Sequence, residues 1–132
     1  MDANLFRTIN LCDLGQVYLI AGKTDMRQGI DSLAYIIKQR FELDPFSGQV
    51  FLFCGGRKDR FKALYWDGQG FWLLYKRFEN GKLNWPSDEK EVKELNSEQV
   101  EWLMKGFSIT PIIKTRGPLK TPVFLQIESL KP

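Results

Sequence analysis

Basic and aromatic side chains are interleaved between residues 50 and 86, and this mixture is the strongest chemical feature of the sequence. The stretch holds seven of the nineteen Lys and Arg residues but three of the sixteen Asp and Glu residues. Cations neutralise nucleic-acid phosphates, and exposed aromatic rings stack on unpaired bases. The mixture therefore predicts a nucleic-acid-binding surface. Its residues would be Arg57, Lys58, Arg60, Lys62, Lys76 and Arg77.

The same side chains allow two other interpretations. Lys and Arg also protect an exposed sheet edge against aggregation, with the aromatic rings packed inside. Alternatively, the rings bind a protein partner, because large aromatic side chains often dominate the energy of protein interfaces. That partner-binding set would be Trp66, Trp72 and Tyr75. Residue types alone leave all three interpretations open.

One short motif suggests a nucleotide site and fails on spacing. Gly22-Lys23-Thr24 matches the end of a phosphate-binding loop, but that motif needs a glycine five positions earlier, where Val17 stands. We therefore expect a simple turn between a strand and a helix, and no nucleotide cofactor.

Carboxylates and thiols give little support for catalysis. Asp25, Asp44 and Asp67 could meet around a metal ion, but each is explained as a helix cap or a turn residue. The sequence has no histidine, and Cys12 and Cys54 stand 42 positions apart, which excludes finger-type zinc sites and histidine-activated nucleophiles. We expect no catalytic residue, no metal and no cofactor.

Composition indicates a single globular domain. The 132 residues are 43% hydrophobic and 14% aromatic, and no apolar run is long enough for a membrane helix. The first residues lack the basic start and apolar core of a signal peptide, so we expect a cytoplasmic protein with no membrane partner.

The N-terminal half predicts one strand and one helix. Residues 17–21 are an apolar run that ends at Gly22, as a buried strand would. Asp25 with Gln28 has the spacing of a capping box, which predicts a helix over 25–40. The apolar stripe expected to face the sheet comprises Met26, Ile30, Leu33, Ala34, Ile37 and Phe41.

Tight-turn residues then predict a chain of antiparallel strands. Asp67-Gly68 and Asn80-Gly81 are hairpin signals, and they separate expected strands over 49–54, 61–66, 71–78 and 83–85. A polar linker follows over 87–95. Asn96 with Gln99 predicts the start of a second helix, which ends near Gly106.

These elements make an α+β fold. We expect a twisted antiparallel meander of four or five strands, one amphipathic helix across one face, and a shorter C-terminal helix. The second face of the sheet, with mixed aromatic and basic side chains, is expected to be free for a partner. Residues 1–15 would form an N-terminal arm, 16–107 the domain, and 108–132 a basic, proline-rich C-terminal arm that could end in an edge strand.

Several short motifs along residues 16–107 resemble the TnpB family, the small accessory proteins from the second reading frame of insertion-sequence sixty-six elements. The motifs are Thr24-Asp25-Met26-Arg27-Gln28-Gly29, Asp44-Pro45-Phe46-Ser47-Gly48, Gly56-Arg57-Lys58-Asp59-Arg60-Phe61-Lys62, Lys76-Arg77-Phe78-Glu79 and Trp85-Pro86. The two terminal arms have no counterpart in this pattern.

The resemblance implies a bacterial mobile-element protein without enzymatic activity. It would assist transposition beside a larger transposase and a second small accessory protein. With the basic and aromatic surface, this predicts binding to transposon DNA or to the transposase-DNA complex. The alternative is a module that docks on the transposase without touching DNA, and a homo-oligomer stays possible in either case.

Overall fold

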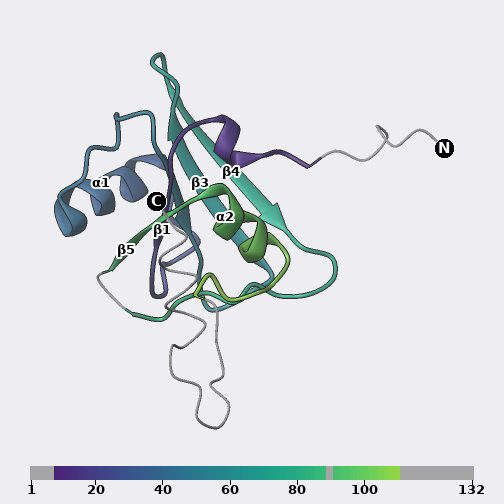
Figure 1. The fold of residues 1–132 in the computed structure, drawn as a ribbon. Coiled ribbons are helices and arrows are strands. Elements are labelled where there is room, and N and C mark those ends of the chain that lie inside the picture. Colours follow the sequence, from purple (N-terminus) through teal and green to yellow (C-terminus); the bar gives the residue numbers. More distant parts are fainter. Residues whose placement is uncertain (1–7, 89–90, 111–132) are drawn as a thin grey trace, which may run out of the picture.

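A five-stranded open sheet is the centre of the computed structural model, which describes residues 8–88 and 91–110 (Figure 1). The spatial order of the strands is β4-β3-β2-β1-β5. The strands are β1 (Val17–Ile20), β2 (Val50–Phe53), β3 (Arg60–Trp66), β4 (Phe71–Arg77) and β5 (Val92–Leu95). The helices are α1 (Ile30–Phe41), α2 (Ser97–Met104) and the short 3-10 helix η2 (Leu11–Asp13). The predicted α+β class is confirmed.

The sheet is mixed, whereas we expected every pair to be antiparallel. Strands β2, β3 and β4 form the predicted antiparallel meander, and β5 is antiparallel to β1. Strand β1 runs parallel to β2, with Val17 opposite Val50. The two strands are parallel because helix α1 connects them. The helix returns the chain to the end of the sheet at which β1 began, so that β2 runs in the same direction.

Two predictions for residues 83–95 were wrong, one of a strand and one of a linker. Residues 83–85 form no strand; Leu83 and Trp85 are buried, and the Trp85 indole Nε1 donates to the Ile20 carbonyl at 3.0 Å. The expected linker over 87–95 instead supplies β5, with Val92 opposite Ile20 and Leu95 buried. An edge strand buries only part of its side chains and can therefore contain charged residues. The charged residues of β5 are the reason that we did not predict a strand there.

Helix α1 begins five residues later than expected. Gly29 stands at its N-cap, and the Asp25 carboxylate instead accepts a hydrogen bond from the Arg27 amide at 3.0 Å, which closes a turn. The apolar stripe is confirmed, since Leu33 and Ile37 are fully buried. For α2, the capping box of Asn96 and Gln99 forms as predicted.

Hydrophobic cores lie on both faces of the sheet, so the second face, which we expected to be free, is largely covered; it stays open at Trp72 of β4, which is 56% exposed. Figure 1 shows α1 and α2 on opposite sides of the sheet. Leu33 and Ile37 of α1 pack with Phe51 and Leu64, while Leu103 of α2 belongs to the core on the other face. All four residues of the central strand β2 are buried, as an entirely apolar strand predicts.

The predicted terminal arms lie mostly outside the described residues. That holds for residues 1–7 and 111–132, including the expected edge strand near the C-terminus. Leu11 of η2 is buried in the core shared with α2. In the described part of the chain, no helix has the length and apolarity needed to cross a bilayer.

Candidate nucleic-acid interface

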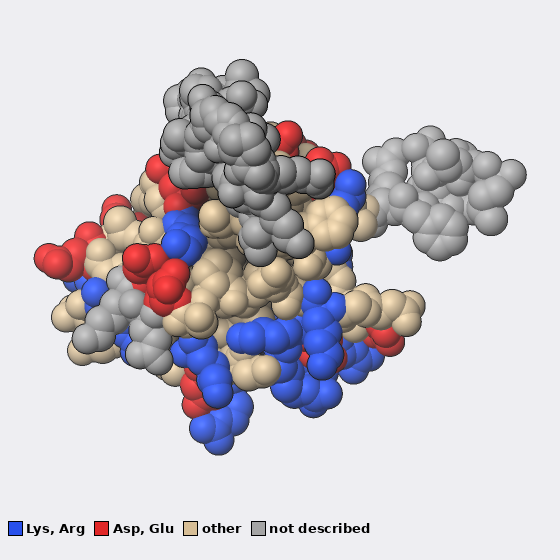
Figure 2. Space-filling model, turned by 60° about the horizontal axis from the view of Figure 1, so that its bottom comes forward, with Lys and Arg blue, Asp and Glu red and all other residues tan. Residues whose placement is uncertain are grey.

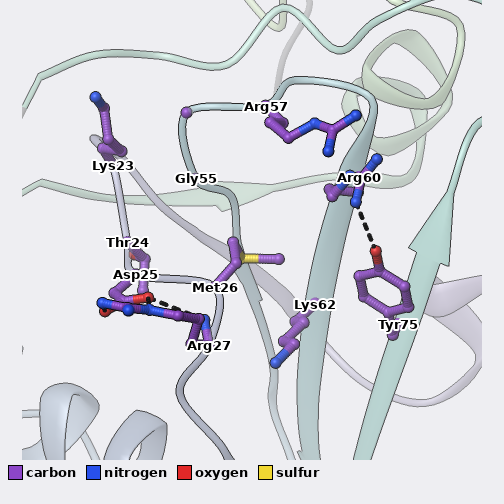
Figure 3. A pocket seen from close by; sticks show the side chains of 11 residues that line it. Lys23, Thr24, Asp25, Met26, Arg27, Gly55, Arg57, Arg60, Lys62 and Tyr75 are labelled. Atoms are coloured by element: carbon purple, nitrogen blue, oxygen red, sulfur yellow. Dashed lines mark hydrogen bonds and ion pairs between the residues drawn. The ribbon is translucent and has the colours of Figure 1, made fainter.

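A hollow of about 830 Å³ opens at one end of the sheet, and cations surround it (Figure 3). We call it the basic cleft. One carboxylate, from Asp25, lies among its lining residues. Its charged and aromatic lining consists of Lys23, Asp25, Arg27, Arg57, Arg60, Lys62 and Tyr75.

The parallel pairing of β1 and β2 explains why these residues meet. Because the two strands run in the same direction, the loops that follow them, residues 21–29 and 54–59, leave the same end of the sheet. Strand β3 is antiparallel to β2 and starts at that end, whereas β4 finishes there. Ligand sites in open sheets commonly lie where such strand ends meet.

Direct contacts fix the two loops against each other. The Thr24 amide donates to the Cys54 carbonyl at 2.8 Å. Gly55 allows this approach, because a Cβ atom at that position would lie 2.7 Å from Met26 Cγ and 3.0 Å from the Thr24 carbonyl oxygen. The loop that carries Lys23 and Arg27 is therefore held beside the loop that carries Arg57.

Strands β3 and β4 place three further side chains in the cleft. Arg60 and Lys62 share one face of β3 because side chains alternate along a strand, and Lys62 stands opposite Tyr75 of β4. The Arg60 guanidinium donates to the Tyr75 hydroxyl at 3.2 Å and to the Asp59 carboxylate at 2.8 Å. Lys62 Nζ donates to the Gln28 carbonyl at 2.9 Å. Hydrogen bonds within the protein therefore hold these side chains in place.

The one carboxylate of the cleft is neutralised by its neighbour. Arg27 Nη2 lies 2.8 Å from Asp25 Oδ2, and the hydrogen bonds from Arg27 lower the pKa of Asp25 to about 2. The Arg27 side chain is 91% exposed, so its outer face can still meet an anion. With five cations and one carboxylate, the lining attracts negatively charged groups.

A buried thiol supports the loop beneath the arginines. Cys54 Sγ lies 3.3 Å from the Arg60 carbonyl oxygen and 3.7 Å from that of Arg57. Burial raises the pKa of this thiol, so it stays protonated and able to donate. Lys58 Nζ donates to the Gly55 carbonyl at 3.0 Å and closes the same loop.

Half of the predicted nucleic-acid set converges in the cleft. Arg57, Arg60 and Lys62 lie there, while Lys58 is turned into its own loop. Lys76 points to the opposite face of the sheet, and its ammonium lies 4.9 Å from the ring centroid of Phe78. Arg77 is paired with Glu79 at 3.1 Å. The six residues therefore do not form one surface.

The predicted partner-binding set is more widely spread. Trp66 packs against Phe71 at 5.0 Å between ring centroids, at the turn between β3 and β4. Trp72 faces the other side of the sheet from Tyr75, and its indole Nε1 donates to the Asp67 carboxylate at 2.8 Å. Tyr75 lies in the basic cleft.

Two cleft residues, Lys23 and Arg27, were missed as candidate site residues. Both precede α1 in a loop far from β3 in the sequence, and only the parallel pairing brings them to Arg57. The sequence signal for them was the family motif over 24–29, which contains Arg27 and which Lys23 directly precedes. Figure 2 shows Lys and Arg gathered on one part of this end of the molecule, with Asp and Glu concentrated elsewhere.

The other candidate chemistries have structural explanations. The Gly22 and Thr24 amides donate to the Pro86 and Cys54 carbonyls, so neither is free to hold a phosphate. Asp44 accepts from the Phe46 amide, and Asp67 accepts from the Gly70 amide. Within residues 8–88 and 91–110, no three His, Cys, Asp or Glu side chains are grouped to bind a metal ion.

Comparison with known proteins identifies relatives. A profile of the family described as "IS66 Orf2 like protein" matches residues 15–114. "Uncharacterized protein y4hO" of Sinorhizobium fredii (strain NBRC 101917 / NGR234) is 35% identical over 105 residues, which cover 80% of this chain and 91% of that protein. "Uncharacterized protein y4jC" of the same organism is 32% identical over 98 residues, which cover 74% and 82%. No solved structure matches the chain.

Proposed function

Because the chain belongs to the IS66 Orf2-like family and so has an accessory role in IS66 transposition, we propose that it binds transposon DNA through the basic cleft. It acts without catalysis of its own, in the bacterial cytoplasm, beside the transposase and a second small accessory protein. One observation carries the DNA-binding proposal: five cations from separate segments surround a single hollow that contains one carboxylate.

The cleft has cations available for phosphates. Lys23 and Arg57 are exposed, and within the described residues their side chains form no hydrogen bond or ion pair. Burying charge against DNA releases condensed counterions, which favours binding at low salt. Arg60 and Lys62 are fixed by their own hydrogen bonds and supply oriented positive charge behind these two side chains.

Docking on the transposase without DNA contact has less support. Its energy would come from Trp66, Trp72 and Tyr75, but the sheet distributes these rings to different ends and faces. A protein interface concentrates its energy in rings that lie close together. This alternative becomes the better explanation only if no DNA binds.

The proposal is tested by removing the charges of Lys23 and Arg57, in the double variant Lys23→Ala/Arg57→Ala. The control Lys38→Ala/Lys105→Ala removes the same charge from exposed positions on α1 and next to α2. Fluorescence anisotropy with labelled DNA over a salt series gives the dependence of log K on log [salt]. The cleft variant should lower this slope by about 2, one unit for each lost phosphate contact. Equal effects of the two variants, or no DNA binding by the parent protein at low salt, would contradict the proposal.

A further inference from the structure

The shape of the basic cleft is poorly suited to a DNA duplex. Reading a duplex requires an element that protrudes into a groove about 12 Å wide, as a helix or a two-stranded ribbon does. Here the cations line a hollow instead. Its volume of about 830 Å³ lies within the range of about 300–1,000 Å³ that is typical of pockets enclosing a small organic ligand.

An unpaired nucleotide can enter such a hollow, whereas a paired one cannot. A base in a duplex enters a pocket only if it leaves its stack and gives up its pairing, which costs free energy. A base in a single strand has already lost its pairing. The cations of the loops 21–29 and 54–59 would then hold the phosphates on either side of the base.

Tyr75 supplies the ring on which such a base can stack. Among the residues that the structure describes, it is the one aromatic residue that lines the cleft, and it is 53% exposed. Its hydroxyl accepts a hydrogen bond from Arg60, which holds the ring at its edge and does not occupy its face (Figure 3). A ring held in this way loses little conformational freedom when a base binds.

We infer that the basic cleft binds an unpaired DNA strand, with a base stacked on Tyr75 and the neighbouring phosphates on the surrounding cations. This inference rests on the proposed function and adds the strand preference to it. Arg60 serves both parts of the site, because its guanidinium positions the tyrosine ring and contributes positive charge.

The test compares one labelled oligonucleotide of about 16 nucleotides, alone and annealed to its complement. The full chain should bind the single strand at least about tenfold more tightly than the duplex. Tyr75→Ala should weaken single-strand binding by about 5- to 150-fold, as expected when one base loses its stacking partner. Duplex binding, which uses only charge, should change by less than about twofold.

Two further variants separate stacking from other effects. Tyr75→Phe keeps the ring and loses the hydrogen bond from Arg60, so it should retain most of the single-strand affinity. Tyr35→Ala removes an exposed tyrosine from α1, outside the cleft, and should leave both affinities unchanged. Circular dichroism of every variant establishes that it is folded.

The outcomes distinguish this inference from the function on which it rests. If the parent protein binds duplex and single strand equally, or if Tyr75→Ala loses no more affinity than Tyr35→Ala, the strand preference is wrong. If at the same time Lys23→Ala/Arg57→Ala weakens binding, the proposed DNA-binding function still holds. If neither form of DNA binds the parent protein at low salt, both proposals fail.

Discussion

At the scale of single residues, Asp25 reduces the positive charge of the cleft that we propose binds DNA. Its carboxylate pairs with Arg27 and stays ionised at any ordinary pH, because the hydrogen bonds from Arg27 hold its pKa at about 2. The same carboxylate closes a local turn by accepting from the Arg27 amide. The residue therefore shapes the loop and opposes the positive charge around it.

Replacing Asp25 with Asn should separate these two roles. The amide oxygen of Asn can still accept from the Arg27 amide, while the negative charge is lost and the Arg27 guanidinium is released. We expect Asp25→Asn to tighten DNA binding by about 3- to 10-fold at low salt, measured by anisotropy. Glu94→Gln, on the distant edge strand β5, removes the same charge and serves as the control. Weaker binding by a folded Asp25→Asn protein would contradict this role.

At the scale of elements, the site depends on the contact between two loops. Residues 21–29 and 54–59 meet because a glycine at position 55 leaves room for the Thr24 carbonyl and the Met26 side chain. Met26 can shift, but the Thr24 carbonyl is backbone, and the amide of the same residue is bonded to Cys54. A side chain at position 55 would separate the cations of the two loops.

Adjacent glycines provide a matched test of that contact. Gly55→Ala should lower the free energy of unfolding by about 1–3 kcal/mol through overpacking, and it should weaken DNA binding. At Gly56 an added Cβ would find its nearest neighbour 3.8 Å away, so Gly56→Ala should change the stability by less than about 1 kcal/mol. Urea unfolding and anisotropy measure the two effects. Equal behaviour of the two variants would mean that the loop contact does not organise the site.

Local sequence patterns predict the elements well and their pairing less well. The Asp67-Gly68 turn and the alternation along β3 and β4 are local features, and both are present in the structure. The parallel pairing of β1 with β2 depends on contacts between distant residues, which periodicity does not reveal. Strand β5 escaped prediction because its Lys and Glu residues are unfavourable in strands until tertiary pairing offsets that preference.

Only part of the candidate site could be predicted, because local patterns reveal a strand but not the pairing between distant strands. Lys62 lies on the strand that we expected over 61–66, and Arg60 shares its face because β3 begins one residue earlier, at Arg60. Lys76 belongs to the neighbouring strand, but its position in the register places it on the opposite face. Lys23 and Arg27 enter the cleft only through the topology of the sheet.

At the scale of the whole molecule, charge is segregated along the chain, and hydrogen bonds lower the pKa of several carboxylates. Residues 49–86 carry seven basic and three acidic groups, whereas residues 87–105 carry three and six. Three aspartates have pKa values below the usual range. Hydrogen bonds from Arg27 act on Asp25, those from Arg60 act on Asp59, and backbone amides of Gly70 and Gln69 act on Asp67.

These lowered pKa values determine how stability should depend on pH. In the unfolded chain the hydrogen bonds are gone, and each aspartate returns to a pKa of about 3.9. The folded protein therefore holds fewer protons than the unfolded chain below about pH 4, and its stability falls as the pH drops through that range.

The sequence has no histidine that would titrate near pH 6.5. We expect the free energy of unfolding to be nearly constant between about pH 5 and 8 and to decline below about pH 4. Urea unfolding at a series of pH values measures this, and Asp67→Asn, which keeps an acceptor for the turn but no titrating group, should flatten the decline. A stability transition near neutral pH would show that another group controls the folded state.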